Sequence, residues 1–151
     1  MFDCWPNLLK RIVLLGAMLL LGCSTPEPMA ITDATVRMPV PGQDKTVGYF
    51  TLQNNASVPM ELVAVRSPQI RAIEMHTTEE RDGMLRMRRL GAIPVAAGER
   101  VHFVTGGKHL MLFGTAALDT VPPPEAVEMV LEFADGTELS VAFRVTPLGG
   151  G

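Results

Sequence analysis

Hydrophobic side chains alternate with polar ones along much of this chain, and this two-residue period is the feature that most limits its fold. The alternation is clearest on either side of Asp135-Gly136, in the segments 127–133 and 139–145. Side chains of a strand point alternately to its two faces, so each segment predicts a strand with one buried face. Asp-Gly is typical of a β-hairpin turn, and the two segments are therefore expected to pair.

Short segments of the same kind continue through the rest of the chain. Further strands are expected at 47–52, 60–65, 69–76, 100–104 and 109–113, with turns at Asn54-Asn55, Asp82-Gly83 and Ala97-Gly98. The chain after residue 23 has no amphipathic helical pattern of ten or more residues, and its prolines suit a loop-rich β protein. Short strands with frequent turns predict an all-β sandwich or barrel.

The N-terminus has the pattern of a lipoprotein signal peptide. A basic pair, Lys10-Arg11, precedes an apolar run at 12–21 that is too short to span a bilayer. The sequence Leu-Leu-Gly-Cys that ends at Cys23 resembles a bacterial lipobox. We expect cleavage before Cys23, lipidation of that residue, and a membrane-anchored protein in the periplasm or cell envelope. Ordinary secretion, with cleavage near the same position, is the alternative.

Cysteine positions and charge narrow the possible functions. The predicted organisation is a signal peptide at 1–22, a lipidated tether at 23–30, one β-sandwich domain at 31–147 and a disordered tail at 148–151. Cys4 and Cys23 precede the domain, which therefore has no disulfide and no thiolate ligand. Zinc-ribbon, iron–sulfur and blue-copper sites are thereby excluded. With 13 Lys and Arg against 16 Asp and Glu, the acidic chain is not expected to bind nucleic acid.

Two pairs of side chains in the second half of the chain could bind a metal. The first pair is His76 and Met87, and the second is His109 and Met111. If Asp82-Gly83 forms a two-residue loop, His76 and Met87 become diagonal neighbours on one face, within roughly 7–8 Å. A one-residue slip would put them on opposite faces. His109 and Met111 are two apart on one predicted strand and share a face.

The chemistry of these four donors selects a soft metal. Thioether sulfur favours Cu(I) over Zn(II), Mg(II) or Ca(II), and imidazole binds copper in either oxidation state. The set contains no thiolate and no carboxylate, so it adds no charge, which favours a monovalent ion. The residues alone leave two interpretations open, because a single methionine on a strand is usually a core residue and a single histidine is usually a surface residue. The four side chains either bind one Cu(I) ion or have ordinary packing and surface roles.

The spacing of these residues resembles the metal motif of the periplasmic copper chaperones of the PCu(A)C type. That motif is a histidine, ten residues, a methionine, twenty-one residues and then His-x-Met, which His76, Met87, His109 and Met111 match without a gap. Three other segments are similar to the family: VGYFTLQNN at 47–55, DGMLRM at 82–87 and GGKHLMLFG at 106–114.

The resemblance implies a cupredoxin-like Greek-key β-sandwich that binds one Cu(I) ion through two histidines and two methionines. It implies a metallochaperone, not an enzyme, that delivers copper towards cytochrome oxidase assembly. The implied partners are a Sco-type thioredoxin-like protein and the copper-bearing oxidase subunit, together with the membrane through Cys23, and the protein is expected to be a monomer. Copper sequestration for resistance, and a structural β-sandwich lipoprotein with no metal role, are the alternatives.

Overall fold

The computed structural model describes residues 27–148, so the predicted signal peptide and Cys23 lie outside the described residues. This part of the chain consists of strands and one short 3-10 helix, which confirms the predicted all-β class. In chain order the elements are β1 (Met29–Arg37), β2 (Lys45–Asn54), β3 (Met60–Arg66), β4 (Ala72–Arg81), β5 (Met84–Arg89), β6 (Ile93–Val95), β7 (Arg100–Phe103), β8 (Lys108–Phe113), η1 (Ala116–Leu118), β9 (Ala126–Phe133) and β10 (Glu138–Thr146).

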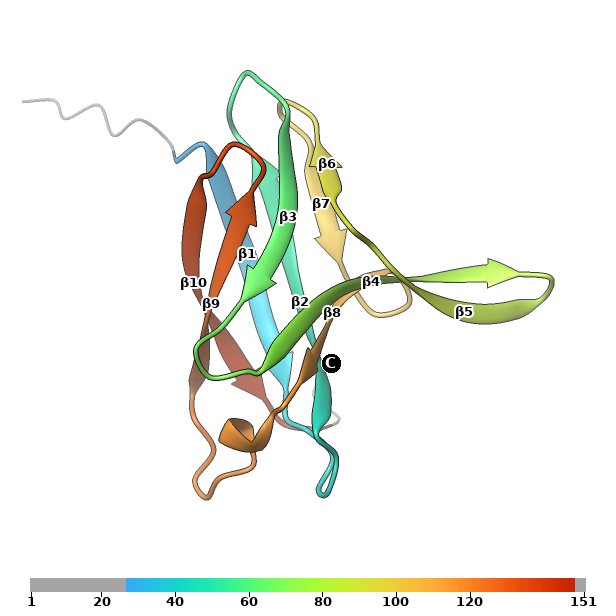
Figure 1. The fold of residues 1–151 in the computed structure, drawn as a ribbon, viewed down its shortest axis with the longest axis vertical. Helices are drawn as coiled ribbons and strands as arrows, with labels where there is room; N and C mark the ends of the chain where they lie inside the picture. The colour runs from blue at the N-terminus through green and yellow to red at the C-terminus, as the bar shows by residue number, and fades with distance from the viewer. Residues whose placement is uncertain (1–26, 149–151) are drawn as a thin grey trace, which may run out of the picture.

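The strands form one continuous mixed sheet of 10 strands in the order β5-β4-β8-β7-β2-β1-β10-β9-β3-β6, with an additional pairing of β8 with β2. β1 pairs in parallel with β10, and β7 in parallel with β8. The sheet curls so that its two halves face each other across a common core, as a single-domain sandwich (Figure 1). The sandwich predicted from the alternating pattern is confirmed.

The two-residue period of the sequence corresponds to burial in the structure. Along β2 every second residue is buried, from Thr46 to Asn54. The predicted hairpin around Asp135-Gly136 is formed by β9 and β10, which place Leu131 opposite Leu139. Gly136 takes the positive φ of 86° that a turn of this kind requires.

β1 was not among the strands predicted from the sequence. Its pairing with β2 shifts register between Thr32 and Thr35, and Asp33 has a positive φ of 56°. This bulge breaks the two-residue burial period that would have identified the strand. Met29 and Ala30, which the sequence analysis placed in the tether, are the first two residues of β1.

Three phenylalanines occupy the centre of the core. The rings of Phe50 and Phe103 stack with their centroids 4.0 Å apart, and the Phe143 ring meets Phe50 edge-on at 5.6 Å. Residues 27–148 contain no cysteine, so packing of this kind has to hold the described domain together without a disulfide. Within the described residues, no helix has the length and apolar character that a membrane span requires.

Replacing Phe50 by alanine is expected to reduce the free energy of unfolding by about 3–5 kcal/mol, because it leaves a cavity against two other rings. Chemical denaturation of the variant measures this loss. Leu85→Ala is the matched control, since Leu85 is 75% exposed and its truncation should change stability by no more than about 0.5 kcal/mol. Equal losses in the two variants would contradict this description of the core.

Candidate metal centre

The β4–β5 hairpin turns at Asp82-Gly83, in the two-residue loop predicted from the sequence. Both residues have positive φ, 56° for Asp82 and 74° for Gly83, as a type I′ turn requires. The hairpin register places Met87 opposite Thr78 and Arg89 opposite His76. Because alternate residues share a face, His76 and Met87 are diagonal neighbours on one face of the hairpin.

On its other side, β4 pairs with β8, and this pairing brings the two histidines together. His76 lies directly opposite His109, and their ring centroids are 5.9 Å apart with an interplanar angle of 40°. Met111 follows two residues after His109 and lies opposite Glu74, so it is on the same face. The structure therefore places all four predicted residues on one face of the three adjacent strands β5, β4 and β8.

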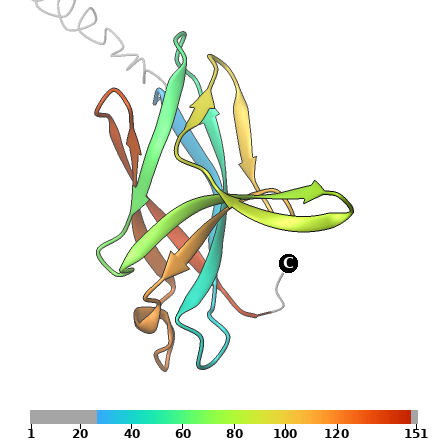
Figure 2. The same cartoon turned by 45° about the vertical axis from the view of Figure 1, so that its right-hand side comes forward.

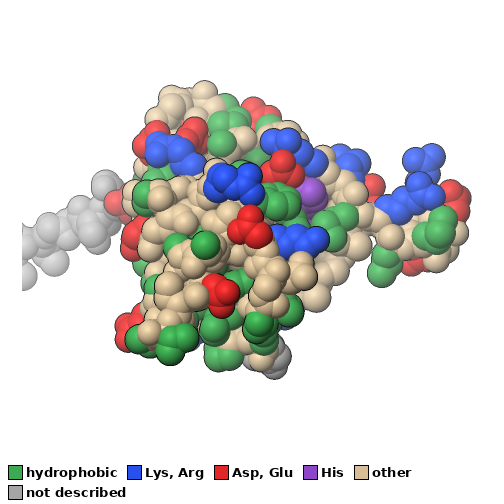
Figure 3. Space-filling model, turned by 60° about the horizontal axis from the view of Figure 1, so that its bottom comes forward, with side chains coloured by type: hydrophobic (Ala, Val, Ile, Leu, Met, Phe, Trp, Pro, Cys, Tyr) green, Lys and Arg blue, Asp and Glu red, His purple; other side chains and the backbone are tan. Residues whose placement is uncertain are grey.

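Exposure differs strongly across this group of four. The His109 side chain is buried, with 5% exposed, whereas Met87 on β5 is 58% exposed; His76 and Met111 are intermediate. β4 pairs with β8 only from Ala72 to Thr77, and the rest of the hairpin stands out from the body of the molecule (Figures 1 and 2). A histidine is visible at the surface near the root of this projection, among basic and acidic side chains (Figure 3).

Each of the two histidines uses one ring nitrogen to hold its orientation and has the other nitrogen free. Nδ1 of His109 donates to the carbonyl oxygen of Gly107 at 3.0 Å, which leaves the lone pair of the neutral ring on Nε2. Nε2 of His76 donates to Oε2 of Glu74 at 2.9 Å, which leaves the lone pair on Nδ1. Nδ1 of His76 is buried and has no hydrogen-bond partner in the structure. A buried acceptor without a partner is unfavourable, and a bound metal ion would satisfy it.

Glu74 and Arg89 support the histidine pair, and the sequence analysis did not identify either residue. Arg89 Nη1 lies 3.1 Å from Oε1 of Glu74, while the other carboxylate oxygen holds His76. The hydrogen bond from His76, followed by the charge of Arg89, lowers the pKa of Glu74 below its usual value. Both could have been found from the sequence, because Glu74 is two residues before His76 and Arg89 is opposite it in the hairpin register.

The donor types in the described part of the chain bear on which metal could bind. Residues 27–148 contain no group of three or more His, Cys, Asp and Glu side chains that could hold an ion. The four-residue group has two imidazoles instead, and its other two donors are the thioethers of Met87 and Met111. Such a set fits a soft monovalent ion and fits Zn(II), Mg(II) and Ca(II) poorly.

Comparison with known protein families identifies the family of this chain. The family "Putative lipoprotein LpqE-like" matches residues 29–145, which include every strand of the fold except the last residue of β10. The chain belongs to the LpqE-like family. A relative from Leifsonia xyli subsp. xyli, "Putative lipoprotein Lxx21020", is 26% identical over 110 residues. That match covers 72% of the LpqE-like chain and 65% of the relative, so the chain spans about two thirds of that protein's length.

Solved structures with a fold similar to that of the LpqE-like chain include a PCuAC domain and the protein DR1885. The copper-bound PCuAC domain of PmoF2 matches with a TM-score of 0.65 and 25% identity, over 80% of this chain and 94% of that domain. The Cu(I) form of DR1885 from Deinococcus radiodurans matches with a TM-score of 0.58 and 30% identity, over 75% of this chain and 74% of that one. Its apo form gives a TM-score of 0.59 and 28% identity, with 82% of both chains covered. The resemblance to PCu(A)C proteins inferred from the motif is confirmed, and so is the fold it implies.

The contacts of Glu74 with His76 and Arg89 lead to a prediction about the pKa of Glu74. Because the pKa of Glu74 is lowered chiefly by the hydrogen bond from His76, His76→Ala is expected to raise it towards the ordinary glutamate value. Arg89→Gln should raise it less. The stability that this carboxylate contributes is present above the pKa of an unfolded glutamate, and it is lost as the pH falls through the lowered pKa.

Carboxyl carbon NMR titration of the metal-free protein measures the pKa of Glu74 in each variant. His102→Ala is the matched control, because His102 bonds to Thr51 and should leave Glu74 unchanged. A Glu74 titration that is identical in the wild type and in His76→Ala would show that the hydrogen bond does not control this carboxylate.

Proposed function

We propose that this protein is a lipid-anchored, extracytoplasmic metallochaperone that binds one Cu(I) ion through His76, Met87, His109 and Met111. Its cargo is the copper ion, and it has no catalytic step of its own. The observation that carries the proposal is the cross-strand pairing of His76 with His109, in which the hydrogen bond of each ring leaves its other nitrogen unused. Nδ1 of His76 is buried without a hydrogen-bond partner in the described structure, and a bound cation would satisfy it.

Related proteins support copper as the cargo. The PmoF2 domain has been solved with copper and DR1885 with Cu(I), and both share the fold of this chain at 25% and 30% identity. The donor chemistry supports the same ion on independent grounds, because two neutral imidazoles and two neutral thioethers add no charge to offset a dication. The carboxylate nearest the site, Glu74, is already engaged by Arg89 and His76.

The difference in exposure suggests how copper would be handed on. His109 is held by a backbone carbonyl and is buried, so it would keep its position with or without the ion. Met87 is exposed on a strand that pairs only with β4, so a donor from another protein could replace its thioether first. If neutral ligands are exchanged one at a time, a protein can bind copper tightly and still transfer it. This favours copper delivery over copper sequestration as the function.

The proposal also covers where the protein delivers copper and how it is anchored. The resemblance to PCu(A)C proteins supports delivery towards cytochrome oxidase assembly, with a Sco-type protein and the copper-bearing oxidase subunit as partners. A lipid on Cys23 would tether the domain to a membrane through the residues that precede β1, which begins at Met29. The lipobox pattern supports this anchor, as does membership of a family described as lipoproteins.

Cu(I) binding is the direct test. We expect the protein to take one equivalent of Cu(I) from a chromophoric chelator, and Met87→Ala/Met111→Ala to lose this binding because both sulfur ligands are gone. X-ray absorption of the copper-loaded wild type should show two sulfur and two nitrogen neighbours.

Met60→Ala/Met84→Ala is the matched control for the loss of two methionines. Met84 is on the opposite face of the hairpin from Met87, and Met60 packs against the core on β3, so neither is placed at the site. Retention of the bound equivalent in the Met87/Met111 variant, or its loss in the control, would overturn the proposed ligand set.

The dependence of binding on pH tests the histidines. Imidazole ligates a metal only when it is neutral. Cu(I) affinity is therefore expected to fall between about pH 7 and about pH 5, where histidine side chains in general take up a proton. Competition titrations at the two pH values measure the change, and His102→Ala should show the same fall as the wild type. An affinity that stays constant over this range would exclude a site with two histidines.

A further inference from the structure

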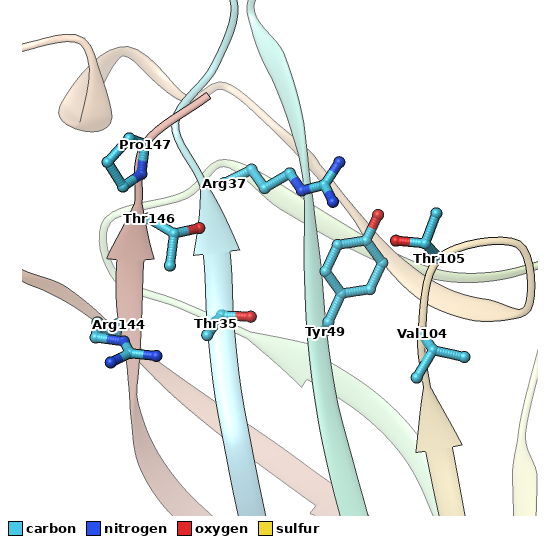
Figure 4. Close-up of a pocket in the computed structure, with 8 residues that line it drawn as sticks. All are labelled: Thr35, Arg37, Tyr49, Val104, Thr105, Arg144, Thr146 and Pro147. Atoms are coloured by element: carbon cyan, nitrogen blue, oxygen red, sulfur yellow. The ribbon is translucent and has the colours of Figure 1, made fainter. Parts of the chain in front are cut away.

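An open pocket of about 630 Å³ lies on the outer face of the sheet, and its lining includes Val104 and Pro147 as well as polar side chains. It is formed by side chains of β1, β2 and β10 and by the loop that precedes β8. Its polar lining consists of two arginines, a tyrosine and three threonines: Thr35, Arg37, Tyr49, Thr105, Arg144 and Thr146 (Figure 4). All of these side chains can donate hydrogen bonds, and none is acidic.

The two arginines of this pocket differ from most others in the described chain. Arg66, Arg71, Arg81, Arg88 and Arg89 all lie beside carboxylates. Arg37 and Arg144 have no carboxylate partner among residues 27–148, although the protein as a whole is acidic, with a net charge of −3. The Arg37 guanidinium instead lies 5.3 Å from the centre of the Tyr49 ring. The pocket therefore presents positive charge that the described protein does not neutralise.

The strand register sets the spacing of the two arginines. β1 and β10 pair in parallel, with Arg144 beside Thr35 and Arg37 beside Thr146. The two arginines are thus on adjacent strands and two residues apart along them, which separates their Cα atoms by roughly 8 Å. In Figure 4 Arg37 lies at the Tyr49 and Thr105 end of the pocket, and Arg144 lies at the other end beside Thr35. Two separate oxyanions match this spacing better than one.

An extended peptide provides oxyanions at this spacing. Carboxylates on alternate residues of a strand point to one face and are roughly 7 Å apart along the chain. Each guanidinium can bind one carboxylate through two parallel N–H bonds, and the surrounding hydroxyls can donate further hydrogen bonds. The pocket is therefore complementary in charge and in spacing to an extended segment with acidic residues at i and i+2.

The pocket adjoins the candidate copper ligands. The β2–β8 pairing ends where Gly48 lies opposite Leu110, and Tyr49 and His109 are the residues directly beyond this pair on the two strands. Leu110 is buried in the core, so Tyr49 and His109 share the outer face. Thr105 belongs to the loop that ends at Gly107, whose carbonyl oxygen accepts the hydrogen bond from His109. A segment bound in the pocket would therefore contact the loop that orients a metal ligand.

We propose that this pocket is the docking site for an extended acidic segment of the protein that exchanges copper with this one, with its i and i+2 carboxylates bound by Arg37 and Arg144. The proposal rests on the proposed copper function for the identity of the partner. The pocket lies near His109 and at the end of β1 that is far from Met29, where the chain enters the domain. This location suits a partner that approaches from the side opposite that entry.

Peptide binding to the metal-free, full-length protein tests the docking site without copper. We expect a peptide of alternating glutamine and glutamate to shift the NMR signals of the pocket, and its all-glutamine counterpart to have no effect. Arg37→Gln/Arg144→Gln should weaken binding about tenfold or more, and added salt should weaken it as well. Arg86→Gln/Arg100→Gln removes the same charge from two arginines outside the pocket that also have no carboxylate partner within residues 27–148, and should leave binding unchanged.

Three results of this titration would overturn the proposal. They are absence of acidic-peptide binding, equal weakening in both double variants, and binding of inorganic phosphate or of vesicles with anionic lipid at this pocket in place of the peptide. The last result would assign the pocket to a phosphate group and not to a protein partner.

Copper transfer then separates docking from copper binding. A Cu(I)-binding acceptor peptide is made with and without the acidic extension, and its rate of copper uptake from the loaded protein is measured. Arg37→Gln/Arg144→Gln should slow transfer to the acidic acceptor about tenfold and leave transfer to the neutral acceptor and the equilibrium Cu(I) affinity unchanged. If Cu(I) is bound but the variant transfers it to the acidic acceptor as fast as the wild type does, docking is wrong. If no Cu(I) is bound, the copper function is wrong and the peptide titration still decides the pocket.

Discussion

The pairing of β4 with β8 is the contact on which the candidate metal centre depends. It sets His76 opposite His109, and it also places Glu74 beside Met111 on the same face. A shift of this pairing by one residue would turn one histidine into the core and bring a leucine to the surface, because Leu110 and Met75 occupy the alternate positions. The buried leucines of β8 therefore fix the register of the ligands on the opposite face.

Charge around the site follows from the same register. Glu74 is the carboxylate nearest the two histidines, and it is bound on one oxygen by His76 and on the other by Arg89. The four proposed ligands carry no charge when their histidines are neutral, and Glu74 and Arg89 behind them form an ion pair. Such an arrangement orients His76 and fixes its tautomer without adding net charge to the site, a usual function of carboxylates behind metal-binding histidines.

Much of this could be predicted from the sequence, because the informative patterns are local. The two-residue period gives the strands, Asp82-Gly83 gives the hairpin register, and the spacing of His109 and Met111 gives their common face. The direct contact of His76 with His109 joins residues 33 positions apart, and nothing local specifies it. β1 escaped prediction because its bulge at Asp33 interrupts the period. The arginine pocket also could not be foreseen, since β1 and β10 pair from opposite ends of the domain.

The β4–β5 hairpin supports Met87 differently from the other three proposed ligands. Three of the four donors are on the stretch where β4 and β8 are joined to the body of the sheet, whereas Met87 belongs to an arm supported along one edge only. Bending of that arm would move Met87 relative to the other three proposed ligands. If these residues bind copper as proposed, the lifetime of the bound ion would depend on this arm, whereas the stability of the core would not.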